Sequence, residues 1–309
     1  MSFDVLLQPI AIIFLDIALG FIGAKLGIVT DRDSKFLSNL VMTFALPCNL
    51  LASANIDAGQ GTVTLMLEGF VQLEILYLVS TGVCLALARA LHFTAGQKAV
   101  FVGVTALPNS GFIGLPLAIG VLGSAMGTVY AASGIIAYNI FFFTYVVHLF
   151  QPDKKFEPKS LLTPTNITTV IMVIMLLTGL RLPGVLQSFC SGIGSCTTPL
   201  ALIIVGVMLA GSDLKALVKK PLLYLTSILR CIVFPLVFIL VLWLLPLDRT
   251  MCMGVAILAA CPSGSLAAVL ARQYDTEAEL AGQAVAQSTL AIIVTVPLML
   301  ALASTLFQM

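Results

Sequence analysis

Two short polar stretches interrupt long apolar runs, and they carry the residue types best suited to bind a small ligand. The first is Pro108-Asn109-Ser110-Gly111 and the second is Pro262-Ser263-Gly264-Ser265. Proline removes a backbone donor and clashes with the preceding turn, while glycine permits irregular dihedral angles, so we expect a helix to break at each stretch. The freed N–H groups and the partial positive charge of a half-helix N-terminus suit an anion. The expected substrate-binding residues at these breaks are Pro108, Asn109, Ser110, Pro262, Ser263 and Ser265.

The apolar runs around these stretches are long enough to cross a membrane. Of the 309 residues, 60% are hydrophobic and 9% are charged, against about 25% charged in an ordinary soluble domain. About twenty apolar residues in a helix span the hydrocarbon core, and runs of this length recur along the chain. The sequence therefore predicts an all-α polytopic protein of the cell (inner or plasma) membrane, surrounded by the lipid bilayer. A net charge of +1 argues against a nucleic-acid partner.

The apolar segments divide into ten predicted transmembrane helices. Their approximate bounds are 5–24, 36–54, 66–88, 98–121, 125–149, 164–180, 190–211, 221–245, 250–271 and 279–306. The longest polar interruption carries several lysines and prolines and separates five spans from five. We expect two five-helix repeats, at residues 1–150 and 164–309, joined by a cytoplasmic linker at 151–163.

The distribution of Lys and Arg predicts that both termini lie outside, because basic residues are retained in cytoplasmic loops. With the N-terminus outside, the outer segments hold Arg181 and Arg249, and Arg230 falls within an apolar run. The twelve basic residues assigned to the inner loops are Lys25, Arg32, Lys35, Arg89, Lys98, Lys154, Lys155, Lys159, Lys215, Lys219, Lys220 and Arg272.

Matching positions in the two halves indicate an internal repeat. Leu6-Leu7-Gln8-Pro9 and Leu161-Leu162-Thr163-Pro164 open the first and sixth spans, 155 residues apart. Pro108 and Pro262, in the fourth and ninth spans, are separated by 154 residues. Since each half has an odd number of spans, the second half must enter the membrane in the opposite orientation. This pattern predicts an inverted repeat, which is a common architecture of secondary transporters.

These motifs resemble the auxin efflux carrier family of membrane transporters, over essentially the whole chain. The resemblance lies in Phe44-Ala45-Leu46-Pro47, in the stretch from Asn109 to Leu117, in Ala260-Cys261-Pro262-Ser263, and in Ser288-Thr289-Leu290. It implies ten helices, with a scaffold domain from helices 1, 2, 6 and 7 and a transport domain from helices 3–5 and 8–10, in which broken helices 4 and 9 cross.

The family resemblance also implies a substrate class. Members carry small organic anions, including dicarboxylates such as malonate and malate, and plant members carry auxin. The plant carriers have Asn-Pro-Asn at the first crossover, whereas here Pro108 precedes Asn109 and Ser110. This departure argues against auxin as the substrate. Scaffold helices of such folds often make a dimer seam, so a homodimer is a further expectation.

Charged and amide side chains within the spans are additional candidates, because a charge at mid-bilayer costs at least about 2.5 kcal/mol and usually faces a cavity or a partner. Glu74 and Arg230 are 156 residues apart and therefore lie at equivalent depths, so they could form an ion pair. Alternatively, Glu74 accepts a proton or Arg230 meets a substrate carboxylate. Asp16 is a candidate for ion coupling or for a structural role. Asn49 and Asn139 are candidate substrate ligands.

Other chemistries find little support in the sequence. The seven cysteines form no CxxC pair, and His92 and His148 have no second His or Cys at ligand spacing, so we expect no metal site. The chain contains no nucleotide-binding or nucleophile-elbow motif, and we expect no cofactor.

The sequence therefore predicts a secondary transporter that moves a small organic anion, of the carboxylate class, by alternating access. The alternatives are a Na⁺- or H⁺-coupled symporter of similar fold, an intramembrane enzyme and a non-transporting membrane sensor. The enzyme is disfavoured because the spans contain no clustered acid and base residues, and the sensor because no soluble output domain is present.

Overall fold

The chain folds into helices joined by short connections. The computed structural model describes residues 3–55, 62–151, 162–211 and 220–308, and within these ranges it contains helices and no strands. Most of the predicted linker at 151–163 lies outside the described residues.

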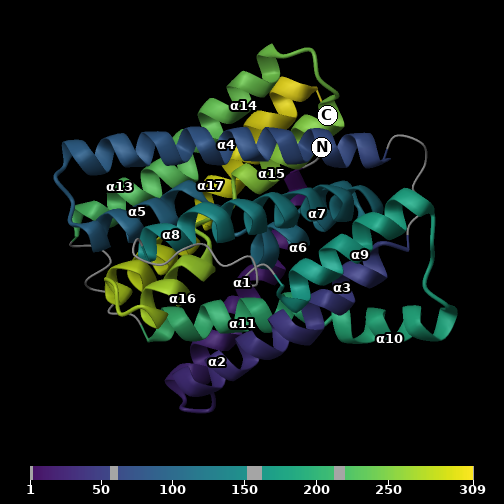
Figure 1. The fold of residues 1–309 in the computed structure, drawn as a ribbon, viewed down its shortest axis with the longest axis horizontal. Coiled ribbons are helices and arrows are strands. Elements are labelled where there is room, and N and C mark those ends of the chain that lie inside the picture. Colours follow the sequence, from purple (N-terminus) through teal and green to yellow (C-terminus); the bar gives the residue numbers. More distant parts are fainter. Residues whose placement is uncertain (1–2, 56–61, 152–161, 212–219, 309) are drawn as a thin grey trace.

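The first half of the chain forms eight α-helices and three π-helical turns (Figure 1). In chain order they are α1 (Phe3–Lys25), α2 (Asp31–Leu40), η1 (Val41–Ala45), α3 (Leu46–Ser53), α4 (Thr62–Ala90), α5 (Ala95–Ala106), η2 (Ser110–Gly114), α6 (Leu115–Leu122), α7 (Ser124–Phe141), η3 (Phe142–Val146) and α8 (Val147–Phe150).

The second half begins with three helices before residues 212–219, which lie outside the described ranges. In chain order the described elements are α9 (Pro164–Thr178), α10 (Gly184–Gly194), α11 (Thr197–Ala210), α13 (Pro221–Ile228), η5 (Leu229–Val233), α14 (Phe234–Leu244), α15 (Arg249–Ala259), α16 (Ser265–Gln273) and α17 (Ala278–Phe307).

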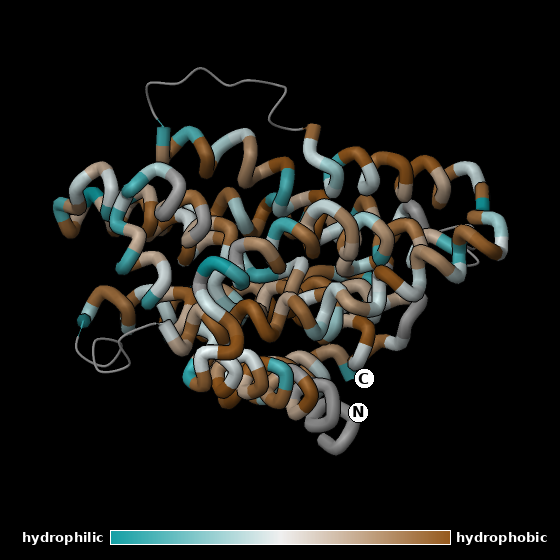
Figure 2. Tube along the Cα trace, turned by 90° about the horizontal axis from the view of Figure 1, so that it is seen from below, coloured by the Kyte–Doolittle hydropathy of each residue, from teal (hydrophilic) through white to brown (hydrophobic). Residues whose placement is uncertain are grey.

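The chain is a multi-pass membrane protein. Within the described ranges, six helical runs are long and apolar enough to cross a membrane: Arg32–Ser53, Thr64–Ala90, Val129–Phe150, Gly184–Ala210, Pro221–Leu244 and Ala278–Phe307. The four other predicted spans are also helical: α1 is 23 residues long, α9 is short, and the α5–α6 and α15–α16 runs are interrupted. Apolar residues dominate the length of the helices (Figure 2). Large apolar side chains such as Leu15, Leu78, Val185 and Leu244 are exposed, as expected of a surface in lipid.

Helix α15 lies at the centre of the packing. Residues Met251–Ala260 are all buried, and α15 contacts α4, α7, α14 and α17. Helices α4 and α7 pack side by side, with α14 above α4 in the view of Figure 1 and α2 and α10 at the lower edge. A second group of contacts joins α1 to α11 and α3 to α9 and α10. The start of α1 and the end of α17 are close together in both views (Figures 1 and 2).

Three of the π-helical turns have a common cause in a proline placed two residues after the turn. Pro47 follows η1, Pro116 follows η2 and Pro235 follows η5. A proline inside a helix has no N–H and its ring clashes with the carbonyl four residues earlier, so the preceding turn widens to relieve the clash.

Helix α1 crosses α11 at a distance that only glycine permits. A Cβ atom added to Gly206 would lie 2.0 Å from the carbonyl oxygen of Ile17, and one added to Gly20 would lie 2.1 Å from the carbonyl oxygen of Ile203. Both obstacles are backbone atoms, which cannot rotate away. Small residues allow close helix packing in membranes, where dispersion contacts replace the hydrophobic effect as the driving force.

We therefore expect Gly206→Ala to destabilise the protein by about 1–3 kcal/mol, because the added methyl group forces the two backbones apart. The measurement is the midpoint of thermal unfolding of purified protein in detergent. Gly82→Ala on α4 is the matched control, since a Cβ atom there meets nothing within 4 Å. Equal midpoints for the two variants would contradict the proposed close crossing.

Candidate functional site

Two interrupted helices meet at their breaks. The α5 helix ends at Ala106 and its run resumes at Ser110, while α15 ends at Ala259 and α16 begins at Ser265. The Asn109 N–H donates to the Pro262 carbonyl at 2.7 Å, and the Gly264 N–H donates to the Leu107 carbonyl at 3.0 Å. These bonds form an isolated antiparallel bridge between the two breaks. Each break therefore supplies hydrogen-bond partners for some of the backbone N–H and carbonyl groups that the other break leaves unpaired.

Asn109 begins the second half of the first interrupted helix. Its side-chain oxygen accepts a hydrogen bond from the Phe112 N–H at 3.1 Å, in the manner of an N-cap. Asn109 is 5% exposed, and its side-chain nitrogen finds no hydrogen-bond partner among the described residues. A buried amide donor of this kind is available for a ligand.

The serines of the two breaks are held by neighbouring helices. The Ser110 hydroxyl lies 3.4 Å from the Tyr77 hydroxyl on α4. The Ser263 N–H donates to the Ser288 hydroxyl on α17 at 3.2 Å. The Ser263 hydroxyl is buried and, within the described parts of the chain, has no partner. The breaks are thus tied to α4 and α17 while keeping unused polar atoms.

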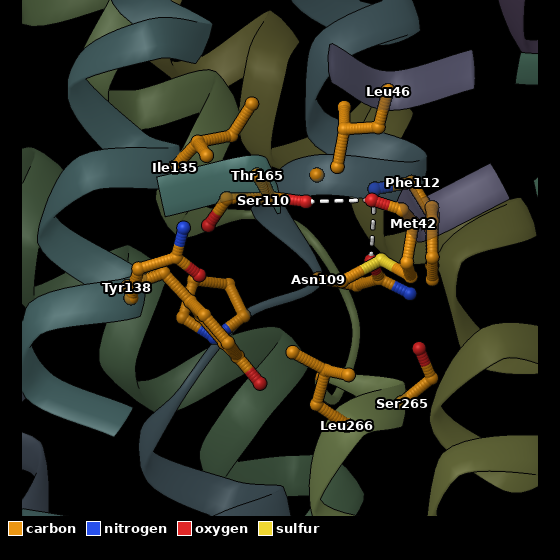
Figure 3. Close-up of a pocket in the computed structure, with 14 residues that line it drawn as sticks. Met42, Leu46, Asn109, Ser110, Phe112, Ile135, Tyr138, Thr165, Ser265 and Leu266 are labelled. Carbon is orange, nitrogen blue, oxygen red and sulfur yellow. Dashed lines mark hydrogen bonds between the residues drawn. The ribbon is translucent and has the colours of Figure 1, made fainter. Parts of the chain in front are cut away.

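A small cavity opens beside the breaks (Figure 3). Its volume is about 40 Å³, which is room for roughly three water molecules or for one small polar group. Fourteen residues line it: Met42, Leu46, Pro108, Asn109, Ser110, Gly111, Phe112, Ile135, Tyr138, Asn139, Thr165, Gly264, Ser265 and Leu266. The lining therefore brings both breaks together with η1, α7 and α9.

The wall of the cavity opposite the breaks depends on the π-helical turn η1. The Leu46 N–H bonds to the Val41 carbonyl, and Pro47 has no N–H to offer the Met42 carbonyl. The Thr165 hydroxyl of α9 donates to that carbonyl at 2.9 Å instead (Figure 3). The pair joins α9 to η1 at the edge of the cavity.

Tyr138 covers the second break. A Cβ atom added to Gly264 would lie 2.7 Å from the Tyr138 hydroxyl oxygen, so a side chain there would have to displace the Tyr138 ring. The Tyr138 ring stacks on Phe142 with centroids 5.3 Å apart. Its hydroxyl is buried without a partner in the described residues, which places a second unused donor at the cavity.

Comparison with known proteins identifies the family of this chain. The profile of the family described as "Membrane transport protein" matches residues 5–159 and 153–300. The chain belongs to this family. The predicted resemblance to the auxin efflux carriers is thereby confirmed at the family level.

Two archaeal relatives of this membrane transport protein are named as uncharacterized transporters. The protein from Methanothermobacter thermautotrophicus is 25% identical over 288 residues, which cover 91% of this chain and 93% of the relative. The protein from Methanocaldococcus jannaschii is 24% identical over 220 residues, covering 68% of this chain and 70% of the relative.

Most of the predicted ligands in this membrane transport protein lie at the breaks or the cavity. Pro108, Asn109, Ser110, Ser265 and Asn139 line the cavity, while Pro262 and Ser263 belong to the bridged second break. Asn139 also faces a larger space of about 450 Å³ between α7 and α9.

Asn49 does not belong to this group. Its side-chain nitrogen donates to the Gly194 carbonyl at 3.0 Å, and its side-chain oxygen accepts from Ser53 at 3.2 Å. A Cβ atom on Gly194 would come within 2.7 Å of the Asn49 backbone, so α10 and α3 are in close contact there. Asn49 therefore fastens α3 to α10 outside the cavity, and its expected role as a substrate ligand stays a prediction.

The expected Glu74–Arg230 ion pair is not formed either. Arg230 donates through one terminal nitrogen to the Ala106 carbonyl at 3.1 Å and through the other to the Ala259 carbonyl. One carboxylate oxygen of Glu74 is buried and meets no hydrogen-bond donor in the described ranges. Equivalent depth in the two halves did not bring the two side chains together, because Arg230 is turned toward the backbone of the breaks.

Asp16 lies outside the lining of the cavity. It is half-buried on α1, next to Ile17 at the close crossing with α11. Within the described residues, no group of three His, Cys, Asp or Glu side chains is placed to hold a metal ion.

The glutamines of α17 pair with α13. The Lys220 ammonium donates to Gln283 at 2.9 Å and to Glu279 at 3.2 Å, and the Ser227 hydroxyl donates to Gln287 at 2.7 Å. These bonds are interhelical contacts that hold α13 against α17.

Tyr77 and Thr165 are neighbours of the site that the sequence did not predict. Tyr77 follows Glu74 by three residues, so the same helical face offered a signal. Thr165 follows the proline that opens α9, but nothing in its spacing indicated that it would reach Met42.

The contact between Tyr138 and Gly264 makes a specific prediction. Gly264→Ala should destabilise the protein by about 1–3 kcal/mol, because the methyl group overlaps the Tyr138 hydroxyl, and Tyr138→Phe should recover part of that loss. Thermal unfolding in detergent is the measurement. Gly111→Ala in the first break is the control, since a Cβ atom there meets nothing within 4 Å. Additive effects of the two changes would argue against the contact.

Proposed function

We propose that this protein is a secondary transporter that moves a small organic anion, of carboxylate type, across the cell membrane by alternating access. Membership of a membrane transport family supports transport, and the chemistry of the cavity supports the choice of an anion. The observation that carries the proposal is the meeting of two helix breaks at one cavity that contains unused hydrogen-bond donors.

The helix segments that begin at Ser110 and Ser265 both start at this cavity. The first N–H groups of a helix have no intrahelical acceptor and carry a partial positive charge. The Asn109 amide and the Tyr138 hydroxyl add donors from the side chains. A carboxylate accepts hydrogen bonds and carries negative charge, so it satisfies both features of the cavity.

The size of the cavity limits what enters it in this conformation. A volume of about 40 Å³ accommodates one carboxylate group and leaves the remainder of a larger acid outside. We propose that the rest of the substrate extends past Asn139, which faces both this cavity and the larger space between α7 and α9. Alternating access then requires the breaks to move relative to η1 and α9.

The architecture that we propose for this movement is the ten-helix inverted repeat of residues 1–150 and 164–309. The contacts of α1 with α11 and of α3 with α9 and α10 support a scaffold, and the contacts among α4, α5, α7 and α13–α17 support a transport domain. The proximity of the start of α1 to the end of α17 supports an even number of membrane crossings (Figure 1).

Asn109→Asp tests the anion site. The substitution keeps the side-chain oxygen that caps Phe112 and replaces the unused donor by a negatively charged oxygen. We expect affinity for malonate, malate or another bound carboxylate to fall at least about tenfold, because a charge-assisted hydrogen bond is lost. Ligand-induced thermal stabilisation and uptake into proteoliposomes are the measurements. Gln308→Glu makes the same chemical change at the exposed end of α17 and should leave binding unaltered. Retained binding by Asn109→Asp would place the site elsewhere.

The proposed topology has its own test. A reporter fused at Lys154 should be cytoplasmic and one fused after Met309 should be external, because basic residues concentrate in the loops assigned to the inside. Alkaline phosphatase and fluorescent protein fusions report the two locations. A cytoplasmic C-terminus would be incompatible with ten crossings that start from an outer N-terminus.

A further inference from the structure

Arg230 links the two interrupted helices at the C-terminal ends of their first halves, α5 and α15. It is fully buried, at 0% exposure, and lies in the π-helical turn η5. Its guanidinium donates to the carbonyls of Ala106 and Ala259, which are the last residues of α5 and α15. The last carbonyls of a helix have no intrahelical donor, so Arg230 satisfies one such group in each helix.

The charges at this point balance. A helix C-terminus carries roughly half a negative charge, so two of them together amount to about one. The guanidinium supplies one positive charge, and no carboxylate lies within ion-pair distance of it among the described residues. The two carbonyl ends are therefore the partners of a cation that would otherwise be costly to bury.

The helical segments that follow the two breaks present their N-termini, which carry partial positive charge. They begin at Ser110 and Ser265, a few residues beyond Ala106 and Ala259, and both starts lie at the cavity. Without a cation, the negative ends of α5 and α15 would offset much of the positive potential that these starts create. A buried charge at the ends of α5 and α15 influences the potential a few residues away in the cavity, because the low-dielectric surroundings screen it weakly.

We propose that Arg230 is the specificity-determining residue that makes the crossover select anions, although it does not line the cavity. It acts as a positioning residue through two backbone carbonyls: it holds both breaks together and neutralises their negative ends. This inference rests on the proposed function, because it concerns the charge preference of the same cavity.

A charge effect can be separated from a purely structural one by comparing an acid with its neutral amide. Arg230→Gln removes the charge but retains an amide donor for a carbonyl, and Arg230→Lys retains the charge but loses the fork of two donors. Loss of structure would weaken binding of acid and amide alike, whereas loss of charge weakens binding of the acid selectively.

The experiment uses purified full-length protein and a panel of malonate, malate, succinate and benzoate, each beside its amide. The ratio of amide to acid dissociation constants is measured by calorimetry. We expect Arg230→Gln to lower this ratio by about tenfold to hundredfold and Arg230→Lys to keep it within about threefold. Arg249→Gln, which removes an exposed arginine at the start of α15, is the control and should not change the ratio.

An unchanged ratio in Arg230→Gln would overturn the inference, as would an equal loss in Arg230→Lys. If Arg230→Gln does not yield folded protein, Arg230→Met replaces it as the variant without the charge: a lowered ratio supports the role of charge, and an unchanged ratio refutes it. If the parent binds no acid in the panel, the proposed function fails and the inference falls with it. That result differs from acid binding with an unaltered charge preference, which refutes the inference alone.

Discussion

Backbone hydrogen bonding in the absence of water is the constraint on which this structure depends. In hydrocarbon an unpaired N–H or carbonyl costs several kcal/mol, so a helix that breaks within the membrane needs other partners. Here the breaks at Pro108 and Pro262 supply bonds to each other through the bridge of Asn109 and Gly264. Arg230 and Ser288 supply bonds from other helices. The buried helix α15 and the Tyr138 side chain enclose these bonds.

The need for hydrogen-bond partners also distinguishes this site from an ordinary helix kink. Some polar side chains of the interior have partners, as Asn49 has in Gly194 and Gln283 has in Lys220, whereas other buried hydroxyls, such as that of Tyr130, have none within the described residues. The side-chain nitrogen of Asn109 and the hydroxyl of Tyr138 lack partners within the described residues, and both residues line one cavity. Buried donors without partners are uncommon in folded proteins because each carries a desolvation cost. Their convergence at one place is the physical reason to assign a ligand there.

The breaks could be predicted from sequence because proline and glycine act locally, whatever surrounds them. The partners of long side chains could not. The repeat offset placed Glu74 and Arg230 at similar depth, but depth does not specify the direction in which a side chain turns about its helix. Arg230 reaches the carbonyls of Ala106 and Ala259, and the need for a donor there arises only once both helices have broken. In the same way, the Met42 carbonyl became a partner for Thr165 only after Pro47 had widened the turn before it.

The π-helical turns also change the phase of each helix. A π-helical turn accommodates one extra residue, and each residue of an α-helix occupies about 100°. The faces of α13 and α14 are therefore offset by about one residue across Leu229–Val233, and those of α2 and α3 across Val41–Ala45. A single helical wheel drawn through either segment assigns the residues after the turn to the wrong side. Pro47 and Pro235 thus each let one continuous helix turn its face by about 100° relative to lipid and protein across the π-helical turn.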